Sequence, residues 1–170
     1  MKRHIVISVP AQAVRLVESG CVLHEWSCST ATAGVGERNG SGCTPRGQHM
    51  IRARIGAGCA PGTVFVGRRP TGEIWSPQLA RANPDRDWIL TRILWLSGCE
   101  PGFNRLGNVD TMRRYIYIHG SPDTAEMGVP GSHGCVRMRN ADVAELFDLV
   151  ETGTSVHILD EAFADTEGAS

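Results

Sequence analysis

The chain has 170 residues, a net charge of −1, 41% hydrophobic residues and 21% charged residues. This length supports one globular domain with a real core, and this composition is neither that of a disordered chain nor that of a coiled coil. The near-neutral charge gives no electrostatic basis for binding nucleic acid or an anionic membrane. No stretch approaches the roughly 20 consecutive apolar residues of a membrane span. We therefore expect one domain over residues 1–170, with no nucleic-acid partner and no membrane span.

The beginning of the chain does not have the pattern of a signal peptide. A signal peptide needs roughly 7–15 apolar residues after its positive start. Here the apolar run covers only residues 5–9, is interrupted by Ser8 and ends at Pro10. We therefore expect a cytoplasmic protein, with a periplasmic protein that has a lost or unusual export sequence as the alternative.

The first half of the chain reads as short strands separated by turns. β-Branched and apolar residues predominate in these runs, and glycine, serine and proline lie between them. The segment 33–47 is rich in Gly, Asn, Ser and Pro and is predicted to be a loop. The predicted strands are 4–9, 13–18, 21–27, 50–55, 63–67 and the strongly apolar 88–96.

A second Gly- and Asn-rich loop is predicted over 99–109. Its Glu100 and Asn104 are candidates for a substrate rim, although loop polarity alone explains them. The following segment, 114–118, alternates large apolar side chains and is predicted to be a strand. Two tyrosines, Tyr115 and Tyr117, would then share one face of that strand.

One amphipathic helix is predicted over 141–151, because apolar residues recur there at helical spacing. Asn140 is the expected N-cap and Gly153 the expected C-cap. A last strand follows over 154–159, and residues 160–170 are expected to form a flexible polar tail. The expected class is mainly β with one or two short helices.

The six cysteines favour neither a zinc site nor disulfides. They form no Cys-x-x-Cys pair, and none lies beside a histidine at ligand spacing. A chain of this length without a secretory signal does not need disulfides for stability. Apart from the last one, we expect most of them to be small buried hydrophobes. They are Cys21, Cys28, Cys43, Cys59, Cys99 and Cys135.

The chemistry is concentrated between residues 117 and 138. His119 is expected at the end of the strand, and a Gly- and Pro-rich loop then leads to Ser132-His133-Gly134-Cys135. A cysteine nucleophile needs an imidazole, backbone N–H groups for an oxyanion, and a group that orients the imidazole. All these residue types are present here. From the residues alone, Cys135 is as readily a buried hydrophobe, and either histidine can be the base.

Two motifs in this chain resemble those of the YkuD-type L,D-transpeptidase catalytic domain. One is His119-Gly120 followed by the run Ser132 to Met138, and the other is Thr44-Pro45-Arg46-Gly47, which matches the family's Thr-Pro-x-Gly element. The resemblance extends over roughly residues 4–159. It implies a YkuD-like β-sandwich or open barrel of mixed strands with one or two short helices.

The resemblance also implies roles for the site residues. Cys135 would be the nucleophile and His119 its general base, oriented by the carbonyl of Gly120. The backbone amides of His133, Gly134 and Cys135 would be candidates for the oxyanion hole. No metal or organic cofactor is implied.

The resemblance also implies roles for three further residues of the site. Ser132 would brace the nucleophile loop through hydrogen bonds. Arg137 would either bind a substrate carboxylate or form a structural salt bridge, and the two interpretations are equally weighted. Tyr117, with Tyr115, would line the donor pocket or pack in the core.

The family acts on the stem peptides of peptidoglycan, so such stems are the expected partners. We expect Cys135 to attack the bond between the third residue, usually diaminopimelate, and D-alanine. With water as acceptor, the protein would be an L,D-carboxypeptidase on recycled tetrapeptide muropeptides in the cytoplasm. The alternative is a periplasmic L,D-transpeptidase that forms 3-3 cross-links or exchanges D-amino acids. A wall-binding module without activity is a third possibility. Carbapenem-type β-lactams are the expected acylating inhibitors.

Overall fold

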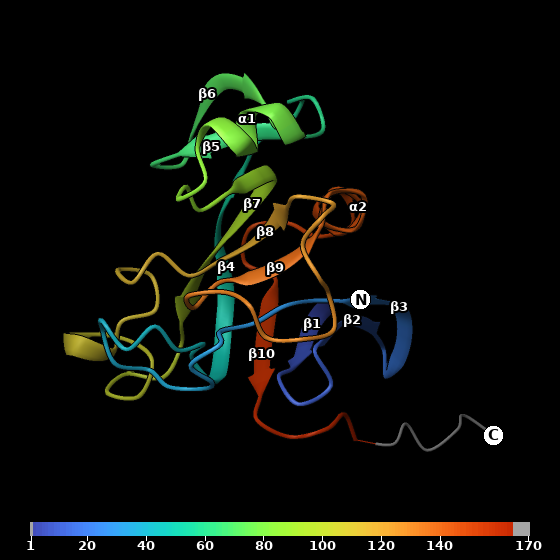
Figure 1. Cartoon of the computed structure of the whole chain (residues 1–170). Helices are drawn as coiled ribbons and strands as arrows, with labels where there is room; N and C mark the ends of the chain where they lie inside the picture. The colour runs from blue at the N-terminus through green and yellow to red at the C-terminus, as the bar shows by residue number, and fades with distance from the viewer. Residues whose placement is uncertain (1, 165–170) are drawn as a thin grey trace.

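The computed structural model describes residues 2–164 and has a mainly β architecture with two α-helices. Figure 1 shows a curled sheet, with α2 beside β8 and β9 and with α1 beside the β5–β6 hairpin. The predicted fold class is confirmed. The elements are β1 (Arg3–Ser8), β2 (Ala13–Glu18), β3 (Cys21–Ser27), β4 (Gly47–Ile55), β5 (Thr63–Val66), β6 (Arg69–Ile74), α1 (Pro77–Ala82), β7 (Ile89–Gly98), η1 (Gly107–Val109), β8 (Tyr117–Ser121), β9 (Val136–Arg139), α2 (Asn140–Leu149) and β10 (Ser155–Leu159).

The sheet has ten strands, and β7 is the strand at which it branches. Its main path runs in the order β3-β2-β1-β10-β4-β7-β5-β6, while β8 pairs with β7 and β9 pairs with β8. Two pairings are parallel, β1 with β10 and β8 with β9. The long strand β7 therefore connects the N-terminal half of the sheet to β8 and β9, the two strands next to which the motif residues lie.

The main core lies between the inner face of the curled sheet and α2. Alternate residues of the strands point into it, as the buried Ile5 and Ile7 of β1 show. Helix α2 buries Val143, Leu146 and Phe147 at helical spacing on the same core. The predicted apolar face of this helix is therefore confirmed, and the helix covers the back of the strands that present the site.

Most predicted strands are confirmed with ends that differ by a few residues. The segments predicted at 13–18 and 21–27 match β2 and β3 in full. Four elements were missed, namely β6, β9, α1 and the short 3-10 helix η1. Strand β6 carries proline, glycine and charged residues at the edge of the sheet, a composition that resembles a loop.

The strand predicted at 114–118 was displaced, because β8 begins only at Tyr117. Tyr115 has a positive φ of 58°, so it cannot continue an extended strand. A turn precedes it, in which Asp110 accepts backbone N–H groups from Leu106 and Arg113. His119 consequently lies in the middle of β8 and not at its end.

The helix caps were also wrong in detail. Helix α2 begins at Asn140, with Arg139 in the N-cap position, and ends at Leu149 before Gly153. The Asn140 side chain instead accepts a hydrogen bond of 2.5 Å from the Thr91 hydroxyl. It therefore connects the helix to β7, which explains why it does not cap the helix.

The cysteines differ from the expectation that most of them are buried. Only Cys28 is fully buried, and its burial raises the pKa of its thiol to about 12. Cys21 and Cys99 are exposed, while Cys43 and Cys59 are intermediate. Of these five cysteines, only Cys28 meets the expectation of burial.

The predicted tail of residues 160–170 is described only as far as residue 164. Within that part, the carbonyl of Glu161 accepts a hydrogen bond of 2.7 Å from Ser8. The ring of Phe163 lies 4.0 Å from the guanidinium of Arg15. These contacts join the segment to β1 and β2, and residues 165–170 lie outside the described part.

Asn104 is a structural residue of the 99–109 loop and not part of a substrate rim. It is fully buried, and its amide donates to the carbonyls of Arg46 and Gln48 at 3.0 Å each. Its side-chain oxygen accepts from the backbone of Glu100 at 2.9 Å. The Glu100 carboxylate in turn accepts from the backbone of Gln48 at 2.9 Å. Both side chains therefore hold two loops together.

We expect the substitution Asn104→Ala to destabilise the protein by about 2–4 kcal/mol, because it removes three hydrogen bonds and leaves the Arg46 carbonyl and the Glu100 N–H without their partner. Urea unfolding followed by circular dichroism measures this difference. The matched control is Asn108→Ala, an exposed asparagine of the same loop, which should change stability by less than about 0.5 kcal/mol. Equal effects of the two substitutions would contradict the role given to Asn104.

Candidate active site

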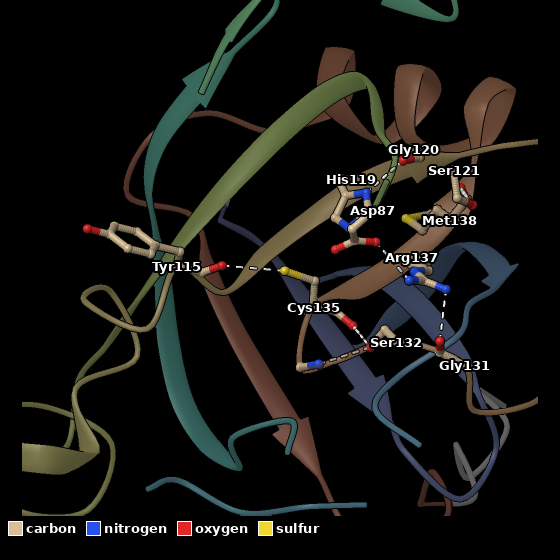
Figure 2. A network of polar contacts seen from close by, with 11 residues as sticks. Asp87, Tyr115, His119, Gly120, Ser121, Gly131, Ser132, Cys135, Arg137 and Met138 are labelled. Carbon is tan, nitrogen blue, oxygen red and sulfur yellow. Dashed lines mark hydrogen bonds and ion pairs between the residues drawn. The ribbon is translucent and has the colours of Figure 1, made fainter. Parts of the chain in front are cut away.

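Four predicted site residues form one patch on adjacent strands. The parallel pairing of β8 with β9 sets His119 opposite Arg137 and Ile118 opposite Val136. Because alternate residues of a strand share a face, Tyr117 and His119 lie on the same side as Cys135 and Arg137. Ile118 and Val136 point the other way, into the core. The register therefore brings the predicted nucleophile and base together (Figure 2).

His119 is buried and is oriented as a proton acceptor. Its Nδ1 lies 2.6 Å from the carbonyl oxygen of Gly120. A carbonyl only accepts hydrogen bonds, so we assign the ring proton to Nδ1, which leaves Nε2 unprotonated. Burial lowers the pKa of His119 to about 4, an effect that the hydrogen bond to Gly120 and the charge of Asp87 partly oppose. The imidazole is therefore neutral at physiological pH.

Cys135 precedes β9 and keeps part of its surface open to the cavity. Its thiol donates to the carbonyl of Tyr115 at 3.4 Å and accepts from the N–H of Tyr117 at 3.3 Å. Among the described residues 2–164, the Cys135 thiol forms no hydrogen bond with the His119 ring. Burial of the sulfur raises the pKa of Cys135 to about 12. The resting pair is thus a neutral thiol and a neutral imidazole.

Ser132 fixes the loop that presents the thiol. Its hydroxyl donates to the carbonyl of Cys135 at 2.6 Å and accepts from the N–H of Gly134 at 3.2 Å. Thr44 holds the same loop from the other side, because its hydroxyl donates to the carbonyl of Gly134 at 2.9 Å and accepts from the N–H of Ala31 at 3.0 Å. These four hydrogen bonds hold the loop of residues 132–135 in one conformation.

The loop leaves two backbone N–H groups available for an oxyanion. The N–H of Gly134 is taken by Ser132, whereas those of His133 and Cys135 have no acceptor in the described part of the chain. Donors held rigidly in this way are the feature that stabilises negative charge during acyl transfer. Of the three backbone amides expected to form the oxyanion hole, those of His133 and Cys135 therefore remain candidates, and that of Gly134 does not.

Two glycines of the motif are required by the backbone. Gly134 has a φ of 135°, and a Cβ there would lie 3.0 Å from the Cδ1 of Ile116. A Cβ on Gly120 would lie 2.5 Å from both the side-chain oxygen of Asn140 and the carbonyl of Leu90. Gly120 thus lets β7 and α2 approach the strand whose carbonyl orients His119.

The patch opens into a cavity of about 450 Å³. Arg137 lies in its wall and donates to Asp87 at 3.0 Å and to the carbonyl of Gly131 at 2.9 Å. The structural salt bridge considered for Arg137 is therefore present, and Asp87 was not foreseen from the sequence. His133 is exposed at the rim. The lining residues are Gly67, Arg68, Asp87, Ile89, Tyr115, Tyr117, His119, Ser132, His133, Cys135 and Arg137.

The two tyrosines line this cavity, although Tyr115 does so from the turn and not from the strand. Tyr117 is buried and Tyr115 is 53% exposed. Arg68, another residue missed from the sequence, donates to the hydroxyl of Tyr117 at 3.0 Å. Arg68 lies in the two-residue turn between β5 and β6. The sequence is compatible with a turn there, but nothing in it indicates that this turn faces Cys135.

A second hollow lies outside the candidate active site. A larger hollow of about 950 Å³ is lined by the start of β1 and by residues 148–155, and it includes none of the predicted site residues. Within residues 2–164, no group of three or more His, Cys, Asp and Glu side chains is arranged to hold a metal ion. No helix in that part is long and apolar enough to cross a membrane.

Sequence relatives match over short stretches. The chain is 46% identical over 48 residues to the probable L,D-transpeptidase YbiS of Escherichia coli K12, a match that covers 28% of this chain and 16% of that protein. It is 31% identical over 104 residues to a putative L,D-transpeptidase of Fuscovulum blasticum, which covers 58% of this chain and 49% of that protein. The matched parts are thus less than half of each relative.

Solved structures share the fold over nearly the whole chain. An L,D-transpeptidase from Mycobacterium smegmatis superposes with a TM-score of 0.54 at 18% identity, covering 93% of this chain and 58% of that one. L,D-transpeptidase 3 from Mycobacterium tuberculosis, in complex with a faropenem-derived adduct, gives a TM-score of 0.55 at 15% identity and covers 92% and 59%.

The family model of the L,D-transpeptidase catalytic domain, YkuD, matches residues 2–158. This range includes every residue of the nucleophile loop and of the strand that carries His119. The chain belongs to the YkuD family of L,D-transpeptidase catalytic domains.

Proposed function

We propose that this protein is a cysteine acyl-transfer enzyme that cleaves the bond between the third residue of a peptidoglycan stem, diaminopimelate, and a terminal D-alanine. The observation that carries the proposal is the placement of Cys135 and His119 on one face of β8 and β9, with Nε2 of His119 unprotonated. Membership of the L,D-transpeptidase family supplies the substrate class.

In the first half-reaction, the thiol of Cys135 turns from the carbonyl of Tyr115 and transfers its proton to Nε2 of His119. The sulfur attacks the carbonyl carbon of the third residue, and the N–H groups of His133 and Cys135 bind the oxyanion. The C–N bond then breaks, and the amine of D-alanine takes the proton from Nε2. A thioester on Cys135 remains.

In the second half-reaction, we propose water as the acceptor. His119 takes a proton from the water, the hydroxyl adds to the thioester carbonyl, and the sulfur leaves and regains the proton from Nε2. The cavity of about 450 Å³ supports this choice. It lies toward the small end of the roughly 300–1,000 Å³ of ligand pockets, and the end of one stem fills such a space. Water needs no second peptide site.

This version makes the protein an L,D-carboxypeptidase acting on recycled tetrapeptide muropeptides in the cytoplasm. With an amine as acceptor, the same thioester gives 3-3 cross-links or exchange of D-amino acids in the periplasm. Cell fractionation distinguishes the two locations, because recycled stems are cytoplasmic and the assembled wall is not.

The products released from a defined stem peptide test the proposed reaction. Purified protein and a disaccharide-tetrapeptide should yield tripeptide and free D-alanine, measured by mass spectrometry. Cys135→Ala should lower kcat/KM by at least about 1,000-fold and His119→Gln by about 100- to 10,000-fold. Cys99→Ser, which changes an exposed cysteine, is the control and should be fully active.

Dimers without tripeptide would contradict water as the acceptor, and full activity of Cys135→Ala would contradict the proposed nucleophile. Solved relatives include an L,D-transpeptidase in complex with imipenem. We therefore also expect a carbapenem to add its mass to this protein, and the adduct should be absent from Cys135→Ala.

The neutral thiol of Cys135 and the neutral imidazole of His119 predict a specific pH dependence. With the pKa of His119 at about 4, kcat/KM should rise as pH increases through about 4 and then stay level. With the pKa of Cys135 at about 12, its alkylation by iodoacetamide should accelerate steadily between about pH 7 and 9, since only the thiolate reacts. A plateau in alkylation already at neutral pH would indicate a thiolate–imidazolium pair and contradict this prediction.

The hydroxyl of Thr44 donates a hydrogen bond to the Gly134 carbonyl and so holds the loop that carries Cys135. Thr44→Val keeps the shape but removes both hydrogen bonds, so we expect kcat to fall by about tenfold with little change in KM, because the oxyanion donors lose their fixed position. Thr44→Ser should restore most of the activity. A rise in KM alone would show that Thr44 acts in binding and not in positioning the loop.

A further inference from the structure

The turn between β5 and β6 places an arginine in a conformation that disfavours it. The two turn residues, Gly67 and Arg68, have positive φ values of 56° and 66°. Two-residue hairpin turns of this kind prefer asparagine and glycine, because a side chain in the left-handed region is strained. Strained residues of this kind occur preferentially at functional sites. The observed strain therefore directs attention to what the Arg68 side chain does.

The guanidinium of Arg68 lies among three aromatic residues of the candidate active site. It is 4.7 Å from the ring centre of Trp95 and 4.9 Å from that of Tyr115, and it donates to the Tyr117 hydroxyl at 3.0 Å. Arg68 lines the same cavity as Cys135 and His119. Cation–π contacts on two rings hold the guanidinium at this position.

The two cations of the cavity wall differ in their partners. Arg137 is already neutralised by Asp87 at 3.0 Å and also donates to Gly131. Arg68 has no carboxylate partner among residues 2–164, and its one hydrogen bond in that range goes to a tyrosine hydroxyl. A guanidinium has five N–H donors arranged to bind a carboxylate with two hydrogen bonds. Arg68 is therefore the cation that is available to an anionic ligand.

Tyr117 connects this cation to the nucleophile. Its backbone N–H donates to the thiol of Cys135 at 3.3 Å, and its hydroxyl accepts from Arg68. One tyrosine side chain thus separates the attacking sulfur from the guanidinium. In a peptide, the terminal carboxylate lies one residue beyond the scissile carbonyl, and consecutive Cα atoms are about 3.8 Å apart. The carboxylate of a stem that ends there would therefore lie close to the reacting centre, in the cavity that Arg68 lines.

We propose that Arg68 binds the terminal carboxylate of the leaving D-amino acid and so determines specificity for stems that end one residue after the scissile bond. This inference rests on the proposed function, since it assigns the end of the same substrate. It gives Arg68 the carboxylate-binding role that the sequence offered to Arg137.

The test compares two ligands that differ only at the terminus, a tetrapeptide stem with a free D-alanine carboxylate and the same stem as the D-alanine carboxamide. In the Cys135→Ala background, calorimetry should show that the acid binds about 10- to 100-fold more tightly than the amide, as expected for a charge-assisted pair. Adding Arg68→Met should reduce this ratio to within about threefold. Arg68→Lys should keep part of the preference.

Arg69→Met is the matched control, because Arg69 is an exposed arginine next to the same turn. It should leave the acid-to-amide ratio unchanged. With the Cys135 thiol present, the same substitutions should change the kcat/KM ratio for the two stems in the same direction. Circular dichroism of each variant verifies that the fold is retained.

Two results would overturn the proposal. One is an acid-to-amide ratio near one before Arg68 is changed. The other is an equal loss of binding for both ligands in Arg68→Met and Arg68→Lys, which would show that Arg68 only fastens the hairpin to the aromatic rings. An Arg68-dependent preference in binding, without release of D-alanine by the protein with its thiol intact, would uphold this inference and reject the proposed reaction.

Discussion

The parallel pairing of β8 with β9 is the constraint on which the site depends. Its register sets His119 beside Arg137 and puts Cys135 next to Tyr117 on the same face. A shift by one residue would turn these side chains into the core and expose the apolar ones, because side chains alternate along a strand. The apolar contacts of Ile118 on the opposite face therefore fix the catalytic geometry as well as the core.

A second layer of hydrogen bonds converts this patch into a chemically prepared site. The carbonyl of Gly120 assigns the proton of His119 to Nδ1, and Ser132 and Thr44 immobilise the two sides of the nucleophile loop. None of these three groups reacts. One backbone carbonyl and two side-chain hydroxyls therefore determine which nitrogen of His119 can accept a proton and how the loop before β9 is held.

The proposed nucleophile and base, Cys135 and His119, could be identified as candidates from the sequence because the segment that carries them is short and contiguous. Arg68 and Asp87 could not, because each lies more than 30 residues before His119 and reaches the cavity only through the way β5 and β7 fold back. The sequence cannot indicate such long-range proximity without the pairing of the strands. Asn104 shows the opposite error, since a polar residue in a loop was offered as a substrate contact and is a buried structural hub.

The same contrast holds for the fold. Strands with β-branched residues and clear turns were predicted with accurate ends, whereas β9 was hidden by its length of four residues and by the loop before it. The displaced start of β8 has a single cause, the left-handed backbone of Tyr115, which an alternating pattern of large side chains conceals. Local patterns therefore predicted the sheet, and tertiary hydrogen bonds decided where its strands begin.

The burial of the Cys135 thiol has a consequence for its resistance to oxidation. Oxidation to sulfenic and then sulfinic acid begins from the thiolate, so a thiol that keeps its proton is a poor target for peroxide. Burial, which raises the pKa of the Cys135 thiol to about 12, therefore lowers its reactivity toward peroxide. A cysteine that keeps its proton in this way should be oxidised to sulfenic acid more slowly than a permanently ionised one.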